Sequence, residues 1–359
     1  MTEHSDPMPD PMFDPMPAPM SDPISDLLND AYDVVVVGGG AAGLNGALML
    51  ARSRRSVAVI DAGQPRNAPA DGVHGLLGRE GMPPGELLER GRAEVRGYGA
   101  HVVSGEVSRV IQAPTGDGFH VTLADGQATR ARCLLVTIGL VDELPDVAGL
   151  AEAWGHDVIH CPYCHGWEAR DKAIGVLGIG PMSLHQVHLF RQLSEDIVLF
   201  THTMPPLTDE QREQLAARDI RVVEGIVSAW EPGGARLAGA DTDSGADTGT
   251  DTGTLISTLI PRDVLAVGAR FTLRADFLAD LGLRPVEHPT GFGVHIPADA
   301  TGLSSVPGVW LAGNVTDPFA QVGSAAAAGA WAGAQINADL VVEDTRRAVE
   351  ARAAAATQT

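Results

Sequence analysis

The sequence predicts an α/β protein made of two Rossmann-like, three-layer dinucleotide-binding domains, with the second domain inserted in the first. Two glycine-rich turns, over residues 38–43 and 178–183, each follow a short apolar run of the kind that forms a buried parallel strand. The chain of 359 residues is long enough for two such domains. Its 42 glycines and its aromatic content of only 4% are typical of a nucleotide-binding α/β protein.

The net charge of the chain argues against two classes of binding partner. A net charge of −21 and a pI near 4.8 argue against nucleic-acid binding, which needs clustered Lys and Arg, and against docking on an anionic membrane. The N-terminus is acidic and proline-rich rather than basic and then apolar, so no secretory signal is expected and the predicted location is cytoplasmic. The run from Val34 to Ala51 has the length of a membrane span, but its internal glycines favour a strand, a turn and a helix.

Two segments are predicted to lack regular structure. Residues 1–30 repeat Asp-Pro-Met units, and proline at this density prevents helices and strand ladders, so we predict a disordered tail. Residues 239–254 are rich in Gly, Ala, Asp and Thr and are predicted to form a solvated loop.

The first ordered unit is a strand, a glycine-rich turn, a helix and a second strand. The β-branched run over 32–37 is followed by Gly38-x-Gly40-x-x-Gly43, a helix over 41–52, and a strand over 56–60 that ends at Asp61. This is the dinucleotide fingerprint: the glycines let the backbone approach a pyrophosphate, the helix N-terminus faces its charge, and the acid binds a ribose hydroxyl. A glycine-rich turn without a ligand is the alternative. The candidate cofactor-binding residues of this domain are Gly38, Gly40, Ala41, Ala42, Gly43, Asp61, Ala62, Gln64, Arg66, Asn67, His74 and Gly139.

The sequence that follows predicts a helix and then antiparallel strands, after which the chain returns to the first sheet. A helix is expected from about residue 85 to 96, with strands near 101–103, 107–111, 119–123 and 133–137. Ala124-Asp125-Gly126 is a hairpin-turn signal. Gly139 then follows a strand end beside the expected cofactor.

The stretch His160-Cys161-Pro162-Tyr163-Cys164-His165 holds two of the three cysteines in the chain. A Cys-x-x-Cys pair in a nearly cysteine-free chain is typical of a redox dithiol or of half a metal site. Proline suits the first turn of a helix, and a helix N-terminus gives thiols thiolate character, while the flanking imidazoles can carry protons. A zinc site needs a second ligand pair and a structural disulfide is rare in the cytosol, so we predict a redox dithiol with Cys161, Cys164, His160 and His165 as candidate catalytic residues.

The second glycine-rich turn is degraded. Its third glycine is replaced by Ser183, and Pro181 and Met182 stand where phosphates should approach. The strand over 196–200 is followed neither by an acid for a ribose diol nor by an arginine for a 2′-phosphate. The sequence therefore argues against tight NADPH or NADH binding. A capping box at Thr208-x-x-Gln211 predicts a further helix to about Arg218.

The end of the chain is predicted to return to the first domain. A strand over 309–312 ends in the polar turn Gly313-Asn314, and an Ala-rich helix over 323–340 needs small residues for close packing. The expected domains are a discontinuous first domain over 31–146 and 264–342, an inserted domain over 147–263, and a frayed tail over 343–359.

The first glycine-rich unit, the Cys-x-x-Cys, the second glycine-rich turn and the late Gly-Asn turn, in this order, resemble the low-molecular-weight thioredoxin reductase group of flavoproteins. The resemblance covers residues 32–340 and implies a homodimer with FAD in the first domain, cradled by Gly38, Gly40, Gly43 and Asp61. It places Asn314, beside Gly313, where the family has an acid near the ribityl chain, and Gln321-Val322 before a helix aimed at the flavin pyrimidine. It also implies that Cys164 faces the flavin and that Cys161 exchanges with substrate sulfur.

Within that group the chain looks more like the dithiol oxidases that close disulfides in natural products of the gliotoxin and holomycin type. The family has an acid directly after the cysteine pair, and this chain has His165 there. The resemblance also implies that His160 and Asp317 act together as the catalytic base. The alternatives are that His160 is a solvated histidine and that Asp317 belongs to a turn-forming Asp-Pro. We therefore expect FAD-dependent oxidation of a small-molecule dithiol by O2, with H2O2 as product. The alternatives are an NADPH-dependent thioredoxin reductase with a thioredoxin-like protein partner, and a non-catalytic redox or metal-binding sensor.

Overall fold

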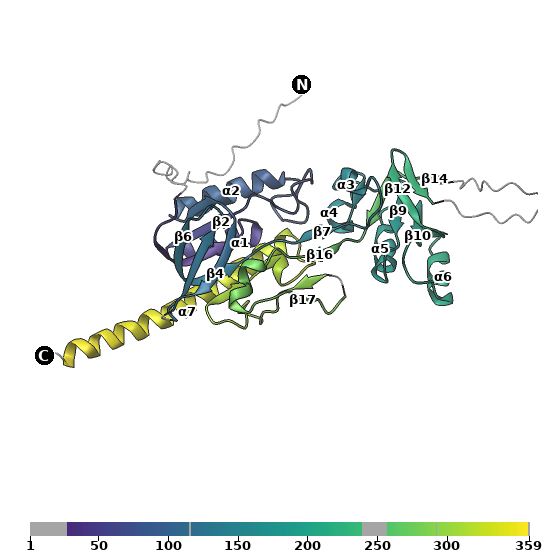
Figure 1. Ribbon diagram of the computed structural model, residues 1–359. Coiled ribbons are helices and arrows are strands. Elements are labelled where there is room, and N and C mark those ends of the chain that lie inside the picture. Colours follow the sequence, from purple (N-terminus) through teal and green to yellow (C-terminus); the bar gives the residue numbers. More distant parts are fainter. Residues whose placement is uncertain (1–26, 115, 239–256, 292, 358–359) are drawn as a thin grey trace, which may run out of the picture.

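Two lobes joined by a two-stranded ribbon make up the molecule (Figure 1). The computed structural model describes residues 27–114, 116–238, 257–291 and 293–357. The ribbon consists of β7 (Val141–Glu143) and β16 (Arg270–Thr272), which pair antiparallel. Most of the predicted tail over 1–30 and the whole predicted loop over 239–254 lie outside the described residues.

The first lobe is built on a seven-stranded sheet with the order β3-β2-β1-β6-β5-β4 and with β19 paired to β6. The strands β1, β2, β3, β6 and β19 pair parallel with one another, while β5 pairs antiparallel with β6 and β4, which is the predicted antiparallel excursion. The β-branched run of β1 is buried on both faces, as a central parallel strand requires. The strands are β1 (Ala31–Val37), β2 (Val57–Asp61), β3 (His101–Ser104), β4 (Val107–Gln112), β5 (Phe119–Leu123), β6 (Ala128–Val136) and β19 (Val309–Leu311).

Two helices with small residues pack on one face of this sheet. They are α1 (Ala41–Arg52) and α7 (Val322–Thr357), and α2 (Pro84–Gly97) lies beside α1. A Cβ on Gly329 would lie 1.9 Å from the Ala42 carbonyl oxygen, and one on Gly46 would lie 2.9 Å from the Gly329 carbonyl oxygen. Only residues without side chains allow these backbones to approach so closely, which explains the Ala- and Gly-rich composition of α7.

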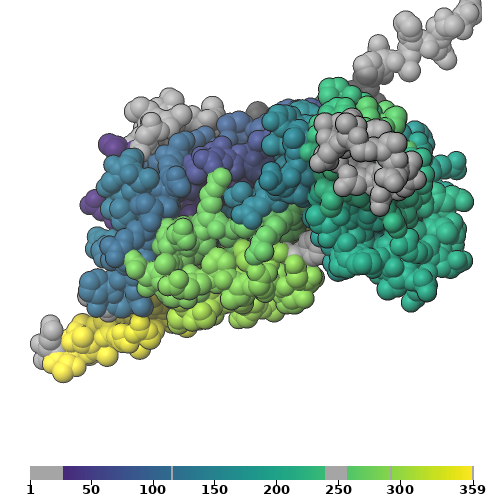
Figure 2. Space-filling view, turned by 45° about the vertical axis from the view of Figure 1, so that its right-hand side comes forward, coloured from purple at the N-terminus to yellow at the C-terminus, as the bar shows by residue number. Residues whose placement is uncertain are grey.

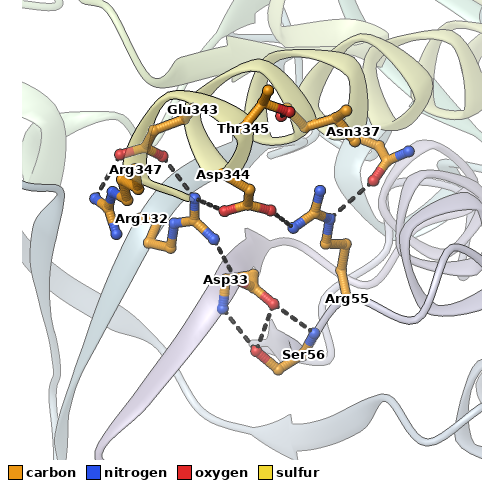
Figure 3. Close-up of polar contacts among 10 residues, drawn as sticks. Asp33, Arg55, Ser56, Arg132, Asn337, Glu343, Asp344, Thr345 and Arg347 are labelled. Carbon is orange, nitrogen blue, oxygen red and sulfur yellow. Dashed lines mark hydrogen bonds and ion pairs between the residues drawn. The ribbon is translucent and has the colours of Figure 1, made fainter. Parts of the chain in front are cut away.

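The predicted frayed tail over 343–359 is helical in its described part, because α7 continues to Thr357. Figure 3 shows the contacts that hold the middle of this helix: Arg132 of β6 lies 2.7 Å from Glu343 and 2.5 Å from Asp344. Asp344 also lies 2.6 Å from Arg55, at the end of α1. These ion pairs fix the helix beyond Leu340, and its last turns project from the first lobe (Figure 2).

The second lobe has a five-stranded parallel sheet in the order β11-β10-β9-β15-β8. The predicted return to the first domain at residue 264 is wrong by one strand: β15 pairs with β9 and β8, so it belongs to the second lobe's sheet. The strands are β8 (Val158–Ile159), β9 (Ile174–Leu177), β10 (Ile197–Phe200), β11 (Arg221–Val223) and β15 (Val264–Val267).

Short helices and small sheets complete the molecule. The predicted capping box at Thr208 and Gln211 begins α6. The remaining helices are α3 (Leu150–Ala153), α4 (Pro162–His165), α5 (Met182–Phe190), α6 (Asp209–Ala216), η1 (Asp276–Leu281) and η2 (Gly313–Val315), and the remaining strands are β12 (Val227–Glu231), β13 (Gly234–Leu237), β14 (Thr258–Pro261), β17 (Val286–Glu287) and β18 (Val294–His295). Within the described ranges, no helix combines the length and the apolar character needed to cross a bilayer.

Candidate active site

The first glycine-rich turn forms an open cradle between β1 and α1. Gly38 adopts a φ of +104°, and a Cβ there would lie 2.7 Å from the Thr137 carbonyl oxygen, so glycine is required. Helix α1 begins after Gly40 without a side-chain cap, and a Cβ on Gly40 would meet nothing within 4 Å. An uncapped helix N-terminus beside open space is the geometry that receives a phosphate.

The third glycine of the motif has a packing role. A Cβ on Gly43 would lie 1.9 Å from the Gly38 carbonyl oxygen, so this residue sets the distance between helix and strand. Asp61, at the end of β2, holds an ion pair with Arg92 of α2 at 2.9 Å. The carboxylate is thereby fixed at the edge of the cradle, where the fingerprint expects it.

The dithiol lies at the start of α4, in the second lobe. Cys161 is the N-cap residue and Pro162 occupies the first helical position, as predicted. The Cys164 thiol donates a hydrogen bond to Cys161 Sγ over 2.7 Å. That hydrogen bond, together with backbone N–H groups and the charge of Arg66, outweighs burial and lowers the pKa of Cys161 to about 7. The same hydrogen bond and burial raise the pKa of Cys164.

Both histidines beside the cysteines are half-buried and favour the neutral form. Burial, followed by the charge of Arg66, lowers the pKa of His160, whose Nδ1 lies 3.3 Å from the Val267 carbonyl oxygen. Burial also lowers the pKa of His165. Neither ring nitrogen of His165 has a hydrogen-bond partner among the described residues, although both are buried. A neutral imidazole without a partner is available to exchange protons with a bound substrate.

One cavity of about 520 Å³ joins the glycine-rich cradle to the dithiol. It is lined by residues from both lobes, including the strand and loop ends of the first lobe, α4 and α5. The structure brings all but four of the predicted site residues to this cavity. Those lining it are Gly38, Gly40, Ala41, Ala42, Asp61, Gln64, Arg66, Asn67, Gly139, His160, Cys161, Cys164, His165, Gly313, Asn314, Gln321 and Val322.

The four predicted residues that do not line this cavity have other surroundings. Gly43 packs against Gly38 and Thr137, and Ala62 lines a neighbouring cavity with Arg92 and Arg96. His74 accepts or donates a hydrogen bond with Glu80 over 2.6 Å. Asp317 is exposed, and its carboxylate accepts the Phe319 N–H over 3.0 Å.

The joint action of His160 and Asp317 stays a prediction, and in the structure two ring contacts connect His160 with the turn that carries Asp317. The His160 ring meets Phe271 edge-on at 5.4 Å, and Phe271 meets Phe319 at 6.0 Å between ring centroids. The Asp317 carboxylate positions Phe319 by accepting the hydrogen bond from the Phe319 backbone N–H. Asn314 has a similar loop-holding role, since its Nδ2 donates to the Asp317 and Ala320 carbonyl oxygens at 3.1 and 2.9 Å.

The sequence interpretation missed two residues beside the dithiol, Asp142 and Phe271. Arg66 donates to Asp142 through Nε at 2.8 Å and Nη2 at 2.6 Å, and its guanidinium lies 4.8 Å from the Phe271 ring centroid. These partners stand far from Arg66 in the sequence, and no local motif marks them. Only the pairing of the ribbon strands brings them together.

The second glycine-rich turn is filled by its own chain. The Ser183 hydroxyl is buried, accepts the Ile179 N–H at 3.1 Å and donates to the Leu177 carbonyl oxygen at 3.2 Å. A Cβ on Gly178 would lie 2.6 Å from Met204 Sδ, so the loop after β10 covers the turn. In the parts of the chain that the structure describes, no group of three or more His, Cys, Asp or Glu is arranged to hold a metal ion.

A dithiol that shares a cavity with a glycine-rich cradle, on two lobes of dinucleotide-binding fold, is the arrangement of a disulfide oxidoreductase of the two-domain flavoprotein class. The family model described as pyridine nucleotide-disulphide oxidoreductase matches residues 32–334. The chain belongs to this family and is an oxidoreductase, for which membership implies flavin and nucleotide binding.

Similar proteins support this assignment. The structure titled "Crystal structure of HlmI" is 43% identical, covers 93% of this chain and 99% of its own, and superposes with a TM-score of 0.79. "Thioredoxin reductase sirT" of Leptosphaeria maculans is 30% identical over 85% of this chain and 93% of its own length. "Thioredoxin reductase tcpT" of Claviceps purpurea is 32% identical over half of this chain, which spans 58% of that relative's length. The chain is thus a thioredoxin reductase-like member of the family.

Proposed function

We propose that the protein is an FAD-dependent dithiol oxidase that converts a small-molecule dithiol into a disulfide and delivers the electrons to O2, giving H2O2. The observation that carries this proposal is the single cavity of about 520 Å³ that the glycine-rich cradle and the Cys161–Cys164 pair line together. The flanking histidines add proton acceptors on both sides of the dithiol.

The cradle fits FAD by the shape that its backbone leaves open. Gly40 has room where a methyl group would stand, α1 has no side-chain cap, and Asp61 is held at the edge of the cavity by Arg92. We infer that these residues hold the adenosine diphosphate part, and that Asn314, Gln321 and Val322 lie beside the flavin ring system. Bound FAD supplies a two-electron acceptor that O2 reoxidises.

His160 prepares the substrate for exchange. Because burial lowers its pKa, the imidazole is neutral near pH 7 and can take a proton from a substrate thiol. The resulting thiolate attacks Cys161 Sγ of the oxidised pair, breaks the Cys161–Cys164 bond and forms a mixed disulfide, with Cys164 leaving as a thiolate. The second substrate thiol then attacks the substrate sulfur of this mixed disulfide, which releases the substrate disulfide and leaves Cys161 reduced.

Cys164 can leave as a thiolate because the hydrogen bond that raises its pKa exists only in the reduced pair. Once Cys161 is bonded to substrate it carries no charge and no longer accepts the Cys164 hydrogen bond. The two largest influences from Cys161 on the Cys164 pKa then disappear. Cys164 would then hold an electron pair as a thiolate on the side of the cavity where FAD would be bound.

The second lobe supports an oxidase without a nicotinamide. Ser183 and Met204 fill the turn where phosphates would approach. Two arginines of this lobe have partners of their own: Arg212 pairs with Glu224 at 3.0 Å, and Arg191 donates to the Arg218 carbonyl oxygen. No free cation of this group faces a 2′-phosphate, so we infer that NADPH is not the electron source.

The test is aerobic mixing of the purified yellow protein with a panel of small dithiols, following O2 uptake and H2O2. We expect turnover without NADPH, and its loss in Cys161→Ser and Cys164→Ser variants. Ser108→Ala, which removes an exposed hydroxyl of β4 outside the cavity lining, is the control. A flavin that NADPH bleaches and dithiols do not would overturn the proposal.

The names of the relatives favour a second candidate, an NADPH-dependent thioredoxin reductase with a thioredoxin-like partner. An anaerobic nicotinamide titration followed by flavin absorbance discriminates between the two functions, because only the reductase accepts hydride from NADPH. The homodimer and the cytoplasmic location stay predictions, and sedimentation velocity of the holoprotein tests the first of them.

A further inference from the structure

Arg66 is bound on two sides by the ribbon that joins the lobes. Its guanidinium makes a two-pronged hydrogen-bonded ion pair with Asp142 of β7, at 2.8 and 2.6 Å. It also stacks on Phe271 of β16, 4.8 Å from the ring centroid. Arg66 itself comes from the loop after β2, in the first lobe. The planar fork of arginine suits this double contact in a way that the point charge of lysine does not.

The two partners of Arg66 are one cross-strand pair. Asp142 and Phe271 are directly opposite in the register of β7 and β16. Both chain crossings between the lobes pass through this ribbon (Figure 1). A side chain that grips both strands therefore constrains the direction in which the second lobe leaves the first.

The grip lies next to the dithiol. The Phe271 ring, which Arg66 covers, also contacts the His160 ring edge-on, with 5.4 Å between the ring centroids. His160 directly precedes Cys161 in the chain. His160 is itself held to the end of β15 by the Val267 carbonyl oxygen, three residues before the ribbon resumes. A change in the ribbon's angle would therefore be transmitted to Cys161 through one aromatic contact and one peptide bond.

The Arg66 contacts are shielded from solvent. The exposed fraction of the Asp142 side chain is 9%, and that of Arg66 is 24%. The same loop meets the second lobe again at His74, whose Nε2 lies 3.7 Å from Glu168, but the Glu168 side chain is 51% exposed. Removing one partner of a shielded, doubly bonded ion pair leaves the other without solvation, whereas exposed pairs contribute little. Arg66–Asp142 is thus the stronger of the two contacts between the loop and the elements across the cavity.

We propose that Arg66 is a positioning residue that clamps the inter-lobe ribbon through Asp142 and Phe271, so that the Cys161–Cys164 pair stays at the cavity of the first lobe. Arg66 also acts on the dithiol through its charge, which contributes to the lowered pKa of Cys161. The consequence of the clamp for turnover rests on the proposed function, whereas its consequence for the ribbon does not.

The test compares Arg66→Met, Arg66→Lys and Asp142→Asn holoproteins with the parent. The first readout is amide hydrogen exchange in β7 and β16, which we expect to accelerate by about tenfold or more in Arg66→Met and Asp142→Asn. The second is small-angle scattering, in which a released second lobe broadens the distance distribution. The third is the long-wavelength charge-transfer absorbance of the Cys164 thiolate against oxidised flavin, measured with Cys161 held in a mixed disulfide, and this absorbance falls several-fold when Cys164 leaves the cavity. Arg66→Lys keeps the charge but not the fork, so we expect a partial rescue.

Arg170→Met is the matched control. Arg170 also covers an aromatic ring, Trp167 at 4.3 Å, and it lies close to the dithiol in sequence, but both residues are exposed and neither contacts the ribbon. We expect parental exchange, scattering and absorbance in this variant. If Arg66→Met matches Arg170→Met in all three readouts, the clamp is refuted. Because Arg66 lines the cavity, loss of FAD with an unchanged ribbon refutes it as well.

The outcome is separable from that of the proposed function. If the parent protein fails to oxidise dithiols, the oxidase is refuted. If amide exchange in the ribbon is nevertheless faster in Arg66→Met and Asp142→Asn than in the parent, the clamp is supported. Should Arg66→Met not fold, Asp142→Asn preserves the size of both side chains and carries the same readouts. Parental exchange in a folded Asp142→Asn would refute the clamp on its own.

Discussion

Cys164 donates a hydrogen bond to Cys161 over 2.7 Å, and this bond divides the acidity of the pair unequally. It is the largest influence that lowers the pKa of Cys161 to about 7 and the largest that raises the pKa of Cys164. In the reduced pair these shifts favour the thiolate on Cys161, at the start of α4, and the thiol on Cys164, which is the arrangement that a nucleophilic sulfur and a second, resolving sulfur require.

The first prediction follows from this asymmetry. In the reduced protein, alkylation by iodoacetamide should modify Cys161 before Cys164, with a rate that rises as the pH increases through about 7. Cys164→Ala removes the hydrogen-bond donor, so the pKa of Cys161 should rise and the rate at pH 7 should fall about fivefold. Mass spectrometry of the alkylated peptide measures both effects. The buried Cys133, whose pKa burial raises to about 12, serves as the internal control and should not react.

The second prediction separates the two roles of glycine in the first turn. Gly40 has a φ of −80°, which alanine adopts, and open space beyond it, so Gly40→Ala should fold normally while its methyl group takes the place of bound FAD. We expect a melting temperature within a few degrees of the parent and a loss of retained flavin of about tenfold or more. Gly43→Ala has no room at all, since its Cβ would lie 1.9 Å from the Gly38 carbonyl oxygen, and it should destabilise the fold by about 3 kcal/mol or fail to fold. Equal flavin retention in the parent and Gly40→Ala would contradict the cofactor assignment.

The features predicted well from the sequence are those that neighbouring residues determine. The first glycine-rich turn, the helix over 41–52 and the cysteine pair at a helix start depend on contacts within about ten residues, and the structure places them as predicted. The β15 run over 264–267 is apolar and would suit either sheet, so only its pairing with β9 and β8 decides its lobe. Likewise the extension of α7 depends on Arg132, which stands about two hundred residues earlier in the chain.

The candidate site shows the same division. The residues at the cradle and the dithiol carry local signals, whereas Asp142 reaches Arg66 only because the ribbon crosses the loop after β2. Asp317 was assigned from a resemblance, but its neighbour Phe319 gives the carboxylate a local partner in the turn. Short polar side chains next to a proline readily bond to their own backbone, and this competes with any distant partner.

The third prediction concerns His160 and Asp317. His160→Ala removes the proton acceptor beside Cys161 and should slow flavin reduction by dithiols by about 10²-fold or more. Asp317→Asn keeps an oxygen that accepts the Phe319 N–H, so the loop and the aromatic contact with Phe271 should survive, and the rate should fall far less than in His160→Ala. Stopped-flow absorbance under anaerobic conditions measures both rates. Equal losses of the flavin-reduction rate in the two variants would support the predicted joint action of His160 and Asp317.

The pH dependence of that step has a defined sign. Burial lowers the pKa of His160, so the imidazole is neutral from near neutral pH upward and becomes protonated only as the pH falls below its ordinary range. The contribution of His160 to flavin reduction should therefore be lost on the acid side and unchanged on the alkaline side. In His160→Ala this acid limb should disappear from the pH profile of the residual rate.

The fourth prediction tests the ion-pair network that extends α7. Arg132→Met removes the partner shared by Asp33, Glu343 and Asp344 and should cost about 1–3 kcal/mol, because it takes the arginine partner from the partly buried Asp33 and one of two arginine partners from Glu343 and Asp344. Arg109→Met is the matched control: its pair with Asp280 is exposed on both sides and should contribute less than about 1 kcal/mol. Chemical denaturation at several pH values measures the difference.

The pH dependence of this stabilisation distinguishes the network from simple packing. The hydrogen bonds from Arg55 and Arg132 lower the pKa of Asp344, and the hydrogen bond from Arg132 lowers that of Glu343 despite its burial. Carboxyls whose pKa is lower in the folded state stabilise it fully above their unfolded pKa, near 4, and lose that contribution as the pH falls through the folded value. The stability gap between the parent and Arg132→Met should therefore be constant from pH 8 to about 5 and should shrink below about pH 4. A gap that persists unchanged into acid would assign the effect to the packing of the arginine side chain rather than to its charge.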